Sequence, residues 1–319
     1  MWPSACCADV LVLSRADVRR LLDLDQLLDA LERAFVELSA GHASVPPRIA
    51  AQTQHGLLAA MPGYADGILE TKLVSVFPGN HDVGLPSHQA TIALFDDETG
   101  KPLALMDGTE ITAVRTGASS AVSTRALARP DARVLAVLGA GVQARSHIGA
   151  VSRVRELVEV RVASRSPEHA QALAEEIGGA LSASFEEAVD GADIVCACTD
   201  AGQPILSAEW LAPGMHVTSV GASREGPELD PAVMSRGLLV VESRVAFEPY
   251  PAGAHELQSL DPDSAAELGE ILAGTRQGRS SSEQITVYKS MGHAVEDAAA
   301  AGLVYRRALE DGAGIEVEL

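Results

Sequence analysis

Two features of the sequence could do chemistry together: a glycine-rich turn and a lysine inside an apolar segment. The turn is Gly139-x-Gly141-x-x-Ala144 in VLAVLGAGVQARS, between an expected strand and an expected helix. Lys72 lies in the middle of GILETKLVSVFPGN, which reads as a buried strand. An unpaired ammonium is costly to desolvate, so Lys72 either points to solvent from an edge strand or faces a negatively charged ligand.

Glycines at this spacing are typical of a dinucleotide site when a strand precedes them and a helix follows. Gly139 would permit the tight turn, and Gly141 would let the backbone approach a pyrophosphate at the helix N-terminus. Ala144 would allow the helix to pack closely on the strand. The alternative is a tight strand–helix turn without a ligand, but the context favours a dinucleotide cofactor.

The end of the next expected strand bears on which cofactor binds. Sites for NAD commonly place Asp or Glu there, roughly 20 residues beyond the glycines. Here VEVRVASRS ends in Ser164-Arg165-Ser166, with no acid at the tip. A guanidinium pairs with a 2′-phosphate and serine hydroxyls can donate to it. The sequence therefore favours NADPH, with NADH as the alternative, unless Arg165 is only a solvated surface arginine.

The pattern of expected helices and strands around these residues differs between the first part of the chain and the part after Ala132. From Ala132 onward, strand and helix alternate at the spacing of a parallel, doubly wound sheet of Rossmann type. The preceding part reads as a helical start followed by mainly antiparallel strands, and DDETGKP predicts a hairpin loop. A final helix in MGHAVEDAAAAGLVYRRALEDG would pack back on this first part. We therefore predict a discontinuous α+β domain, 1–120 with 293–319, and a dinucleotide-binding domain, 121–292.

Composition excludes several classes of protein. The chain has 319 residues and a formal net charge of −20, which argues against a nucleic-acid binder, because such a protein needs a cationic face. We see no secretory signal and no apolar stretch near the roughly 20 residues of a membrane span, so we expect a cytoplasmic protein without a membrane partner. The cysteines, Cys6, Cys7, Cys196 and Cys198, lack zinc spacing and read as reduced thiols; the histidines show no metal spacing either, and we expect no metal.

Two arginines join Lys72 as candidate site residues. Arg48 follows VPP, directly before an expected strand. Arg115 lies in DGTEITAVRTGASSAVSTRAL, an expected helix whose small residues would let Thr116 contact a cofactor phosphate. Each arginine taken alone could be a surface or interface residue, and spacing alone cannot bring the three cations together.

Three long segments carry a resemblance to a known family. They are LPSHQATIALFDDETGKPLALMDGTEITAVRTGASSAVSTRAL, LGAGVQARSH and VGASREGPELD, and they closely resemble the ornithine cyclodeaminase/mu-crystallin family. The likeness runs from Ser14 to about Arg307. Within the family, the chain is most similar to the mu-crystallin branch of NADPH-dependent ketimine reductases.

The resemblance implies the geometry that spacing cannot give. It implies that Arg48, Lys72 and Arg115 surround the carboxylate and the imine of a substrate, with Ser87 and His88 beside it. It also implies that the first domain pairs with its copy in a homodimer. The resemblance also places YKSMG, which contains Ser290, near the nicotinamide. The full set of residues expected at the cofactor is Thr116, Gly139, Gly141, Val142, Gln143, Ala144, Ser164, Arg165, Ser166, Thr199, Gly221 and Ser290.

One position departs from the cyclodeaminase pattern. Ornithine cyclodeaminases carry a catalytic aspartate in the stretch equivalent to VGASREGPELD, and this chain has Ser223 there. A serine cannot take a proton from an amino group at neutral pH, whereas it can hydrogen-bond an imine or an ordered water. The substitution lowers the expectation of ornithine cyclisation and favours plain imine reduction.

We therefore predict NAD(P)H-dependent reduction of a 2-imino acid to the amino acid. Arg48 and Arg115 would hold the substrate carboxylate so that the C=N carbon meets nicotinamide C4. Lys72 would donate the proton, with a pKa below its reference value of ~10.4 because of burial and the two guanidinium charges. The alternative for Lys72 is a cation that only binds the carboxylate.

The expected substrates are cyclic ketimines, such as piperideine- or pyrroline-2-carboxylate, or an imine of a 2-keto acid. Three other functions stay open: reductive amination of the alanine-dehydrogenase type, cyclodeamination of ornithine or lysine, and non-catalytic, NADPH-dependent binding of a small ligand. A carboxylate ligand needs the same cations in each case, so the residues do not separate binding from catalysis.

Overall fold

The computed structural model of the protein describes residues 9–318, and the chain divides into two units. Unit 1 comprises Met1–Arg115 with Ala294–Leu319, and unit 2 comprises Thr116–His293. The first boundary falls at residue 115 rather than 120, inside helix α3 (Gly108–Leu127), which continues from one unit into the other. The second boundary falls directly before helix α8 (Ala294–Asp311). Cys6 and Cys7 lie outside the described residues.

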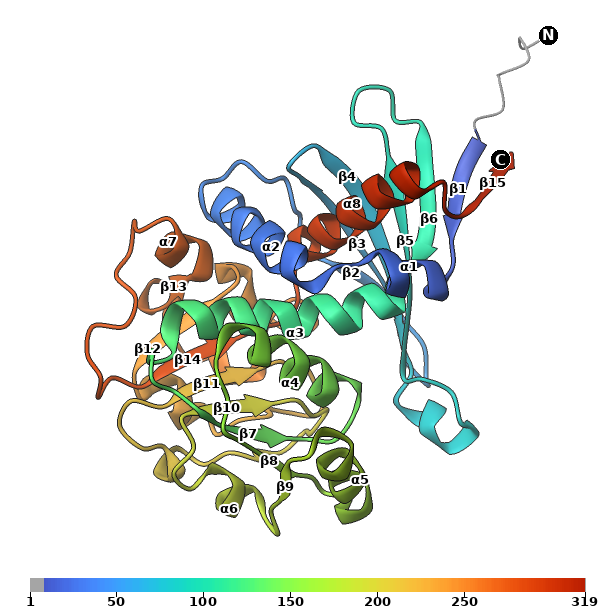
Figure 1. Ribbon diagram of the computed structural model, residues 1–319. Coiled ribbons are helices and arrows are strands. Elements are labelled where there is room, and N and C mark those ends of the chain that lie inside the picture. The colour runs from blue at the N-terminus through green and yellow to red at the C-terminus, as the bar shows by residue number, and fades with distance from the viewer. Residues whose placement is uncertain (1–8, 319) are drawn as a thin grey trace, which may run out of the picture. The chain divides into compact units, whose positions relative to one another are not determined.

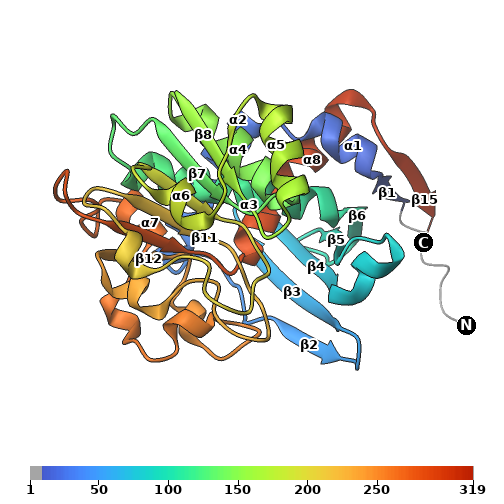
Figure 2. The same cartoon turned by 90° about the horizontal axis from the view of Figure 1, so that it is seen from below.

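Unit 1 is built on a seven-stranded sheet in the order β15-β1-β6-β5-β4-β3-β2. Neighbouring strands are antiparallel except for the parallel pair of β1 and β6. The sequence predicts strands β2 to β6 and the hairpin between β5 and β6, but it does not reveal β1 and β15. Strands β3, β4 and β5 lie side by side (Figure 1 and Figure 2). The strands are β1 (Asp9–Leu13), β2 (Ile49–Gln52), β3 (Leu57–Ala65), β4 (Ile68–Val76), β5 (His88–Phe95), β6 (Pro102–Asp107) and β15 (Ile315–Glu318).

Helices α1 (Arg15–Leu21), α2 (Leu24–Ser39) and α8 pack on one face of this sheet (Figure 1). Helix α2 buries leucines and Phe35 at helical spacing, as its sequence pattern predicts. Helix α8 contacts α2, β3 and β4, and it can approach the strands closely because it is rich in small residues. A Cβ on Gly302 would lie 2.9 Å from the Ile68 side chain.

The position of Lys72 rules out one of the two readings made from the sequence. Strand β4 lies between β3 and β5, so the expectation of an edge strand with a solvated lysine is wrong. Lys72 is 1% exposed. Since side chains alternate along a strand, Glu70, Lys72 and Val74 share the buried face of β4, whereas Leu73 lies on the opposite face and is exposed.

That opposite face of the sheet is apolar. Ile49 on β2 and Leu73 on β4 both pair with Ala60 on β3, so the three residues share one face. Leu58, two residues before Ala60, belongs to the same face. Ile49 is 72%, Leu58 50% and Leu73 44% exposed, values that are high for large apolar side chains.

Unit 2 contains an eight-stranded, fully parallel sheet in the order β13-β12-β14-β11-β10-β7-β8-β9. The doubly wound Rossmann-type prediction is confirmed, although the sequence did not reveal β14 or the two-residue strands β9 and β13. The chain runs from β7 to β8 on one side and then to β10 on the other side of β7. Ligands of such sheets bind where the strand order reverses in this way. The strands are β7 (Val134–Leu138), β8 (Glu159–Ala163), β9 (Ala180–Leu181), β10 (Ile194–Ala197), β11 (His216–Ser219), β12 (Leu238–Val241), β13 (Ala266–Glu267) and β14 (Thr286–Lys289).

The connections between these strands are helices and long loops. The α-helices after α3 are α4 (Val142–Val154), α5 (Pro167–Ile177), α6 (Phe185–Val189) and α7 (Leu268–Leu272). The 3₁₀ helices are η1 (Pro78–Val83) in unit 1 and, in unit 2, η2 (Ala208–Trp210), η3 (Pro231–Ser235), η4 (Arg244–Phe247), η5 (His255–Leu257) and η6 (Pro262–Ser264). Strands β10 and β11 are buried along their whole length, as expected for parallel strands covered on both faces. Within residues 9–318, no helix is both long and apolar enough to cross a bilayer.

Candidate active site

Unit 1 holds a buried network of cations and carboxylates between β4, α3 and α8. The Lys72 Nζ lies 2.6 Å from Asp297 Oδ2. The Arg115 guanidinium donates from Nε to Asp297 Oδ1 and from Nη1 to Glu296 Oε2, both at 3.0 Å. All four side chains are at least 95% buried. Strand β4 therefore presents Lys72 to the first turn of α8, where two carboxylates are also favoured by the helix dipole.

The environment of Lys72 shifts its acidity. Burial lowers the pKa of the ammonium to about 8, although the Asp297 carboxylate opposes the shift. Arg115 lowers the pKa of Lys72 further, and Arg48 adds a smaller effect of the same sign. The direction agrees with the prediction from sequence. Burial raises the pKa of Asp297, but the Lys72 and Arg115 charges outweigh it and hold that pKa below its usual value.

Glu70 lies two residues before Lys72 on the same face of β4 and is 2% exposed. Neither of its carboxyl oxygens has a hydrogen-bond partner among the described residues. Burial, followed by the negative charge of Asp297, raises the pKa of Glu70 to about 9, and the Lys72 and Arg115 charges only partly oppose this. Glu70 is therefore a neutral carboxylic acid at neutral pH.

Arg48 and the two residues expected beside the substrate occupy different places in unit 1. Arg48 immediately precedes β2 and is half-buried, within electrostatic range of Lys72. Ser87 and His88 lie at the start of β5, and their side chains are 3.1 Å apart (Ser87 Oγ to His88 Nδ1). His88 pairs with Val76, four residues along β4 from Lys72, which is a distance of about 13 Å along the strand. The strand register thus does not bring Ser87 and His88 to the lysine.

The glycine turn of unit 2 has the features of a dinucleotide site. Gly139 has φ +121°, and a Cβ there would lie 2.6 Å from the Cys198 carbonyl oxygen after β10. Only glycine fits this turn at the point where the strand order reverses. Gly141 is the N-cap of α4, and no described atom lies within 4 Å of where its Cβ would stand. Ala144 is fully buried, which allows the close helix–strand packing.

The N-terminus of α4 fits an anion. Its cap residue, Gly141, has no side chain to accept from the first backbone N–H groups of the helix. Val142, the first residue of α4, is 65% exposed, so this end of the helix is open. Thr116 lies on α3, next to Gly117, where a Cβ would collide with Ser146 of α4. Two helices that approach so closely place Thr116 near the helix that bears the fingerprint.

The end of β8 carries the three residues expected to distinguish the cofactors. Ser166 is the N-cap of α5, where its Oγ accepts from the His169 backbone N–H. Ser164 Oγ accepts from the Ser166 backbone N–H, and Arg165 is exposed. The local fold therefore uses both serines to form the turn and leaves the arginine at the surface.

Two buried glutamates, Glu228 and Glu242, shape the loops at the carboxyl ends of the parallel strands. Glu228 accepts from Thr199 N and Oγ, from Ser219 Oγ and from the Gly221 backbone N–H. Glu242 accepts from Ser290 Oγ, at 2.7 Å, and from the Gly292 backbone N–H. Three residues predicted at the cofactor, Thr199, Gly221 and Ser290, are thus held in place by carboxylates that the sequence analysis missed.

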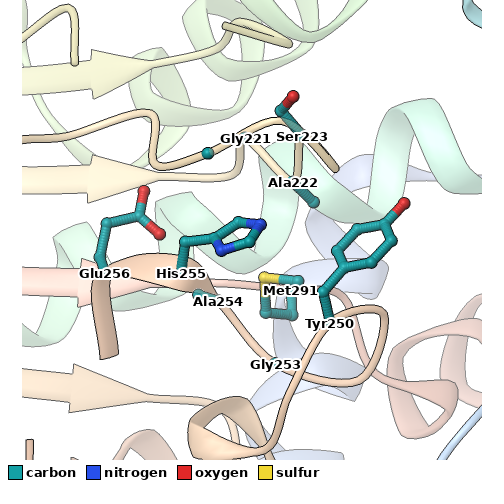
Figure 3. Close-up of a pocket in the computed structure, with 10 residues that line it drawn as sticks. Gly221, Ala222, Ser223, Tyr250, Gly253, Ala254, His255, Glu256 and Met291 are labelled. Atoms are coloured by element: carbon teal, nitrogen blue, oxygen red, sulfur yellow. The ribbon is translucent and has the colours of Figure 1, made fainter. Parts of the chain in front are cut away.

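The loop after β11 lines a small, shallow hollow in unit 2. Figure 3 shows Ser223 with Tyr250, His255 and Met291, which come from distant parts of the chain. The Tyr250 and His255 rings stack with centroids 6.1 Å apart. Ser223 Oγ accepts from the Glu225 backbone N–H, a bond that stabilises the turn.

Sequence reasoning missed the carboxylates of unit 1 as well. Asp297 and Glu296 lie in the first turn of a helix that is otherwise rich in alanine, and both are fully buried. Two acids on the buried face of such a helix are a signal for buried cationic partners. Glu70 lies on the same face of β4 as Lys72, and the alternation of side chains along Glu70-Thr71-Lys72 indicates this from the sequence. Among the described residues, no group of three or more His, Cys, Asp or Glu side chains is arranged to hold a metal ion.

The fold and the site define a class: a two-unit nucleotide-binding protein with a Rossmann-type unit and a second unit that carries buried cations. The sequence profile of the ornithine cyclodeaminase/mu-crystallin family matches residues 8–312, and the chain belongs to this family.

Three relatives illustrate the range of this similarity. The mouse (Mus musculus) ketimine reductase mu-crystallin is 40% identical over 289 residues, which cover 88% of this chain and 91% of the relative. The Thermococcus litoralis Δ1-pyrroline-2-carboxylate reductase, solved with NADH and L-proline, has a TM-score of 0.91 and 38% identity over 97% of this chain and 100% of its own. An archaeal alanine dehydrogenase dimer with bound NAD has a TM-score of 0.89 and 31% identity over 98% and 100%.

Proposed function

We propose that the protein reduces the C=N bond of a 2-imino acid to the corresponding amino acid with NADPH, or alternatively with NADH. The proposed substrates are a cyclic ketimine, such as piperideine- or pyrroline-2-carboxylate, or an imine of a 2-keto acid. The observation that carries the proposal is the buried pairing in unit 1, where Lys72 and Arg115 both contact the Asp297 carboxylate and Arg115 also contacts Glu296. Arg48 lies within electrostatic range of Lys72 and adds a third cation to this region. Cations gathered in this way suit a substrate that carries a carboxylate.

Each cation has a distinct part in binding. We assign the substrate carboxylate to Arg48 and Arg115, because a guanidinium binds a carboxylate through directed N–H groups. Arg115 is held in position by Glu296 and Asp297, so its orientation is fixed before a substrate arrives. Such fixed donors reduce the entropy lost on binding and orient the C=N carbon.

Lys72 supplies the proton that reduction requires. Its N–H bond breaks and a bond forms to the imine nitrogen, which gives an iminium and a neutral lysine. The iminium carbon then accepts a hydride, and the C=N π pair becomes the lone pair of the amine nitrogen. With a pKa of about 8, Lys72 is charged at neutral pH and yet a stronger acid than an ordinary lysine.

Unit 2 supplies the binding site for the cofactor. NADPH, when bound, provides the hydride and its two electrons. Gly139, Gly141 and the N-terminus of α4 would hold the pyrophosphate, and Ser164 and Arg165 would contact the 2′-phosphate. The open space at Gly141 supports this assignment. Two similar proteins were solved with NADH or NAD bound, so NADH remains the alternative to NADPH as the cofactor.

The test is the oxidation of NADPH and of NADH by the purified protein with a panel of imino acids. Piperideine- and pyrroline-2-carboxylate should be reduced, whereas ornithine with the oxidised cofactor should give no cyclic product. Lack of oxidation with every imine at saturating concentration would leave a ligand-binding protein, the alternative from a different class.

Reductive amination is the second candidate because an alanine dehydrogenase is among the similar structures. Pyruvate with ammonium would pass through an open-chain imine that the same cations could bind. A rate with pyruvate and ammonium that exceeds the rate with cyclic ketimines would favour this function.

We also propose that the enzyme is a cytoplasmic homodimer that pairs through the exposed apolar face of unit 1. The face formed by Ile49, Leu58 and Leu73 supports this, and so does the dimer of the archaeal alanine dehydrogenase. Leu73→Glu places a charge on that face without touching the buried side of β4. Sedimentation should show a dimer for the wild type and a folded monomer for Leu73→Glu, with Leu309→Glu, an exposed leucine of α8, as the control. A variant that remains dimeric would contradict this interface.

A further inference from the structure

A lysine and a glutamate buried in unit 2 hold the backbone of one glycine from both sides. Lys289, at the end of β14, is fully buried and donates from Nζ to the Gly221 carbonyl oxygen at 2.6 Å. Glu228 is 1% exposed, and its Oε2 accepts from the Gly221 backbone N–H at 2.8 Å. Hydrogen bonds to charged groups are roughly twice as strong as bonds between neutral ones. Both polar backbone groups of Gly221 are therefore held by side chains of opposite charge.

Gly221 lies so close to Glu228 that no side chain fits between them. A Cβ on Gly221 would lie 2.4 Å from the Glu228 Cδ. The backbone thus rests directly on the carboxylate, and Gly221 cannot turn outward without breaking both charge-assisted bonds. We call Glu228, Gly221 and Lys289 the Gly221 clamp.

The two charged side chains of the clamp have other buried partners as well. Ser219 Oγ donates to Glu228 Oε2 at 2.7 Å and accepts from Lys289 Nζ at 3.0 Å. Glu256 Oε1 lies 3.4 Å from Lys289 Nζ and accepts from the Glu228 backbone N–H. Because each charge has partners besides Gly221, its burial does not by itself account for the two bonds to that glycine.

The clamp lies at the half of the sheet that suits the nicotinamide end of a dinucleotide. The end of β8, on one side of β7, is where a Rossmann-type unit reads the adenosine ribose, and β10, β11 and β14 lie on the other side. Gly221 follows β11, and Glu228 also accepts from Thr199, which follows β10. Since a dinucleotide crosses a doubly wound sheet from one half to the other, these two loops belong to the nicotinamide half.

Beyond Gly221 the loop turns toward the surface. Ala222 is exposed, Ser223 is half-buried, and both line the hollow (Figure 3). At its far end the loop returns to the loop after β10, because a Cβ on Gly226 would lie 2.7 Å from the Gly202 carbonyl oxygen. The course of residues 221–226 therefore depends on how Gly221 is held at one end and Gly226 at the other.

We propose that Glu228 and Lys289 are positioning residues for the nicotinamide half of the cofactor. They act through Gly221 and fix the loop 221–226 before the cofactor arrives, so less conformational freedom is lost when the ring binds. The proposal rests on the proposed function in one respect, namely that the protein binds a nicotinamide dinucleotide.

A pair of ligands separates this role from general stability. In Lys289→Met, which removes the donor and keeps a long side chain, the affinity for NADPH should fall by about tenfold or more. The affinity for 2′-phospho-ADP-ribose, which lacks nicotinamide, should stay within about twofold of the wild-type value, because the adenosine half does not depend on the clamp. Glu228→Gln should behave in the same way. Calorimetric titration measures both affinities, with NADH and ADP-ribose as the pair if the protein prefers NADH.

Two further variants control for the loss of buried bonds and of charge. Ser219→Ala removes one hydrogen bond from each charged side chain but leaves both bonds to Gly221, so the ratio of the two affinities should stay at the wild-type value. Lys289→Met combined with Glu256→Gln removes the ion pair as a unit, which preserves the test if the single variant does not fold. This double variant should still lose NADPH affinity, and a return to the wild-type affinity would show that Lys289 only neutralises Glu256.

Hydrogen exchange tests the clamp without any ligand. In mass spectrometry of the ligand-free protein, residues 220–226 should exchange about tenfold or more faster in Lys289→Met than in the wild type, while the turn at Gly139 should not change. Unchanged exchange in this loop, wild-type NADPH affinity in Lys289→Met, or an equal loss of both ligands would each overturn the proposal. A wild-type protein that binds neither dinucleotide would instead contradict the proposed function, and the exchange rates would still report whether the clamp fixes the loop.

Discussion

The chemistry of the buried network depends on how one lysine is desolvated and compensated. Burial disfavours the charged form of Lys72, and the 2.6 Å contact with Asp297 restores part of the lost stabilisation. The result is a pKa of about 8, between that of a solvated lysine and that of a fully buried, unpaired one. A cation used only to bind a carboxylate needs no such tuning, so the balance favours a role in proton transfer.

Replacement of Lys72 tests that role directly. Lys72→Ala should lower kcat by about 10²- to 10⁴-fold, because it removes the general acid, while NADPH titration by fluorescence stays near the wild-type value. Lys101→Ala, which removes an exposed lysine, should leave both quantities unchanged. Wild-type turnover in Lys72→Ala would mean that the lysine has no part in the proton transfer. In the wild type, activity should fall as the pH rises above about 8, because the ammonium form is lost there.

At the scale of the elements, the strand–turn–helix unit β7–α4 offers a pair of glycines with different constraints. Gly139 has φ +121° and lies against the Cys198 carbonyl, so a Cβ is excluded both by conformation and by contact. Gly141 has φ −89° and open space around it, so a Cβ would fit the protein and fill only the space of a ligand.

The two alanine variants should therefore fail in different ways. Gly139→Ala should lower the free energy of unfolding by about 1–3 kcal/mol or more and weaken NADPH binding as well. Gly141→Ala should keep wild-type stability and lose NADPH affinity alone. Urea denaturation and fluorescence titration of both variants make the comparison. Wild-type affinity in Gly141→Ala would show that the dinucleotide does not approach this backbone.

The elements also explain what the sequence could predict. The fingerprint at Gly139 and Gly141 is local, since strand, turn and helix follow one another directly in the chain, and its prediction needed no tertiary information. Lys72 and Asp297 are 225 residues apart (297 − 72), and only the return of α8 to the first sheet joins them. The return of that helix to the first unit was predicted from its place as the final helix of the chain. The register that sets Asp297 opposite Lys72 was not, because it depends on how the small residues of α8 pack on β3 and β4.

At the scale of the whole molecule, the two units hold buried groups that titrate with opposite sign. In unit 1, Glu70 has a pKa of about 9 when folded and an ordinary acidic pKa when unfolded. In unit 2, burial lowers the pKa of His147 to about 4 and that of His216 to about 3. The neutral His147 ring is held by the Gln143 carbonyl and Ser120 Oγ, and His216 by Thr286 Oγ1, so each is satisfied without a charge.

These shifts predict a maximum of stability near pH 6.5. Below that pH, the unfolded chain binds a proton on each histidine that the folded chain does not, so each lowers stability by about 1.4 kcal/mol per pH unit as the pH falls toward 4. From about pH 4.5 to about 9, the folded chain binds a proton on Glu70 that the unfolded chain has lost, so stability decreases as the pH rises. Above about pH 8, Lys72 opposes that decrease, because its pKa is lower in the folded chain.

Single variants separate the two sides of this curve. In urea denaturation at a series of pH values, Glu70→Gln should remove the decrease between pH 6.5 and 8 and leave the acid side unchanged. His147→Gln should reduce the slope on the acid side by about 1.4 kcal/mol per pH unit, whatever its effect on stability at neutral pH. His169→Gln, which removes an exposed histidine of α5, should change neither side. An alkaline decrease that persists in Glu70→Gln would mean that Glu70 is not the group that holds the extra proton in the folded protein.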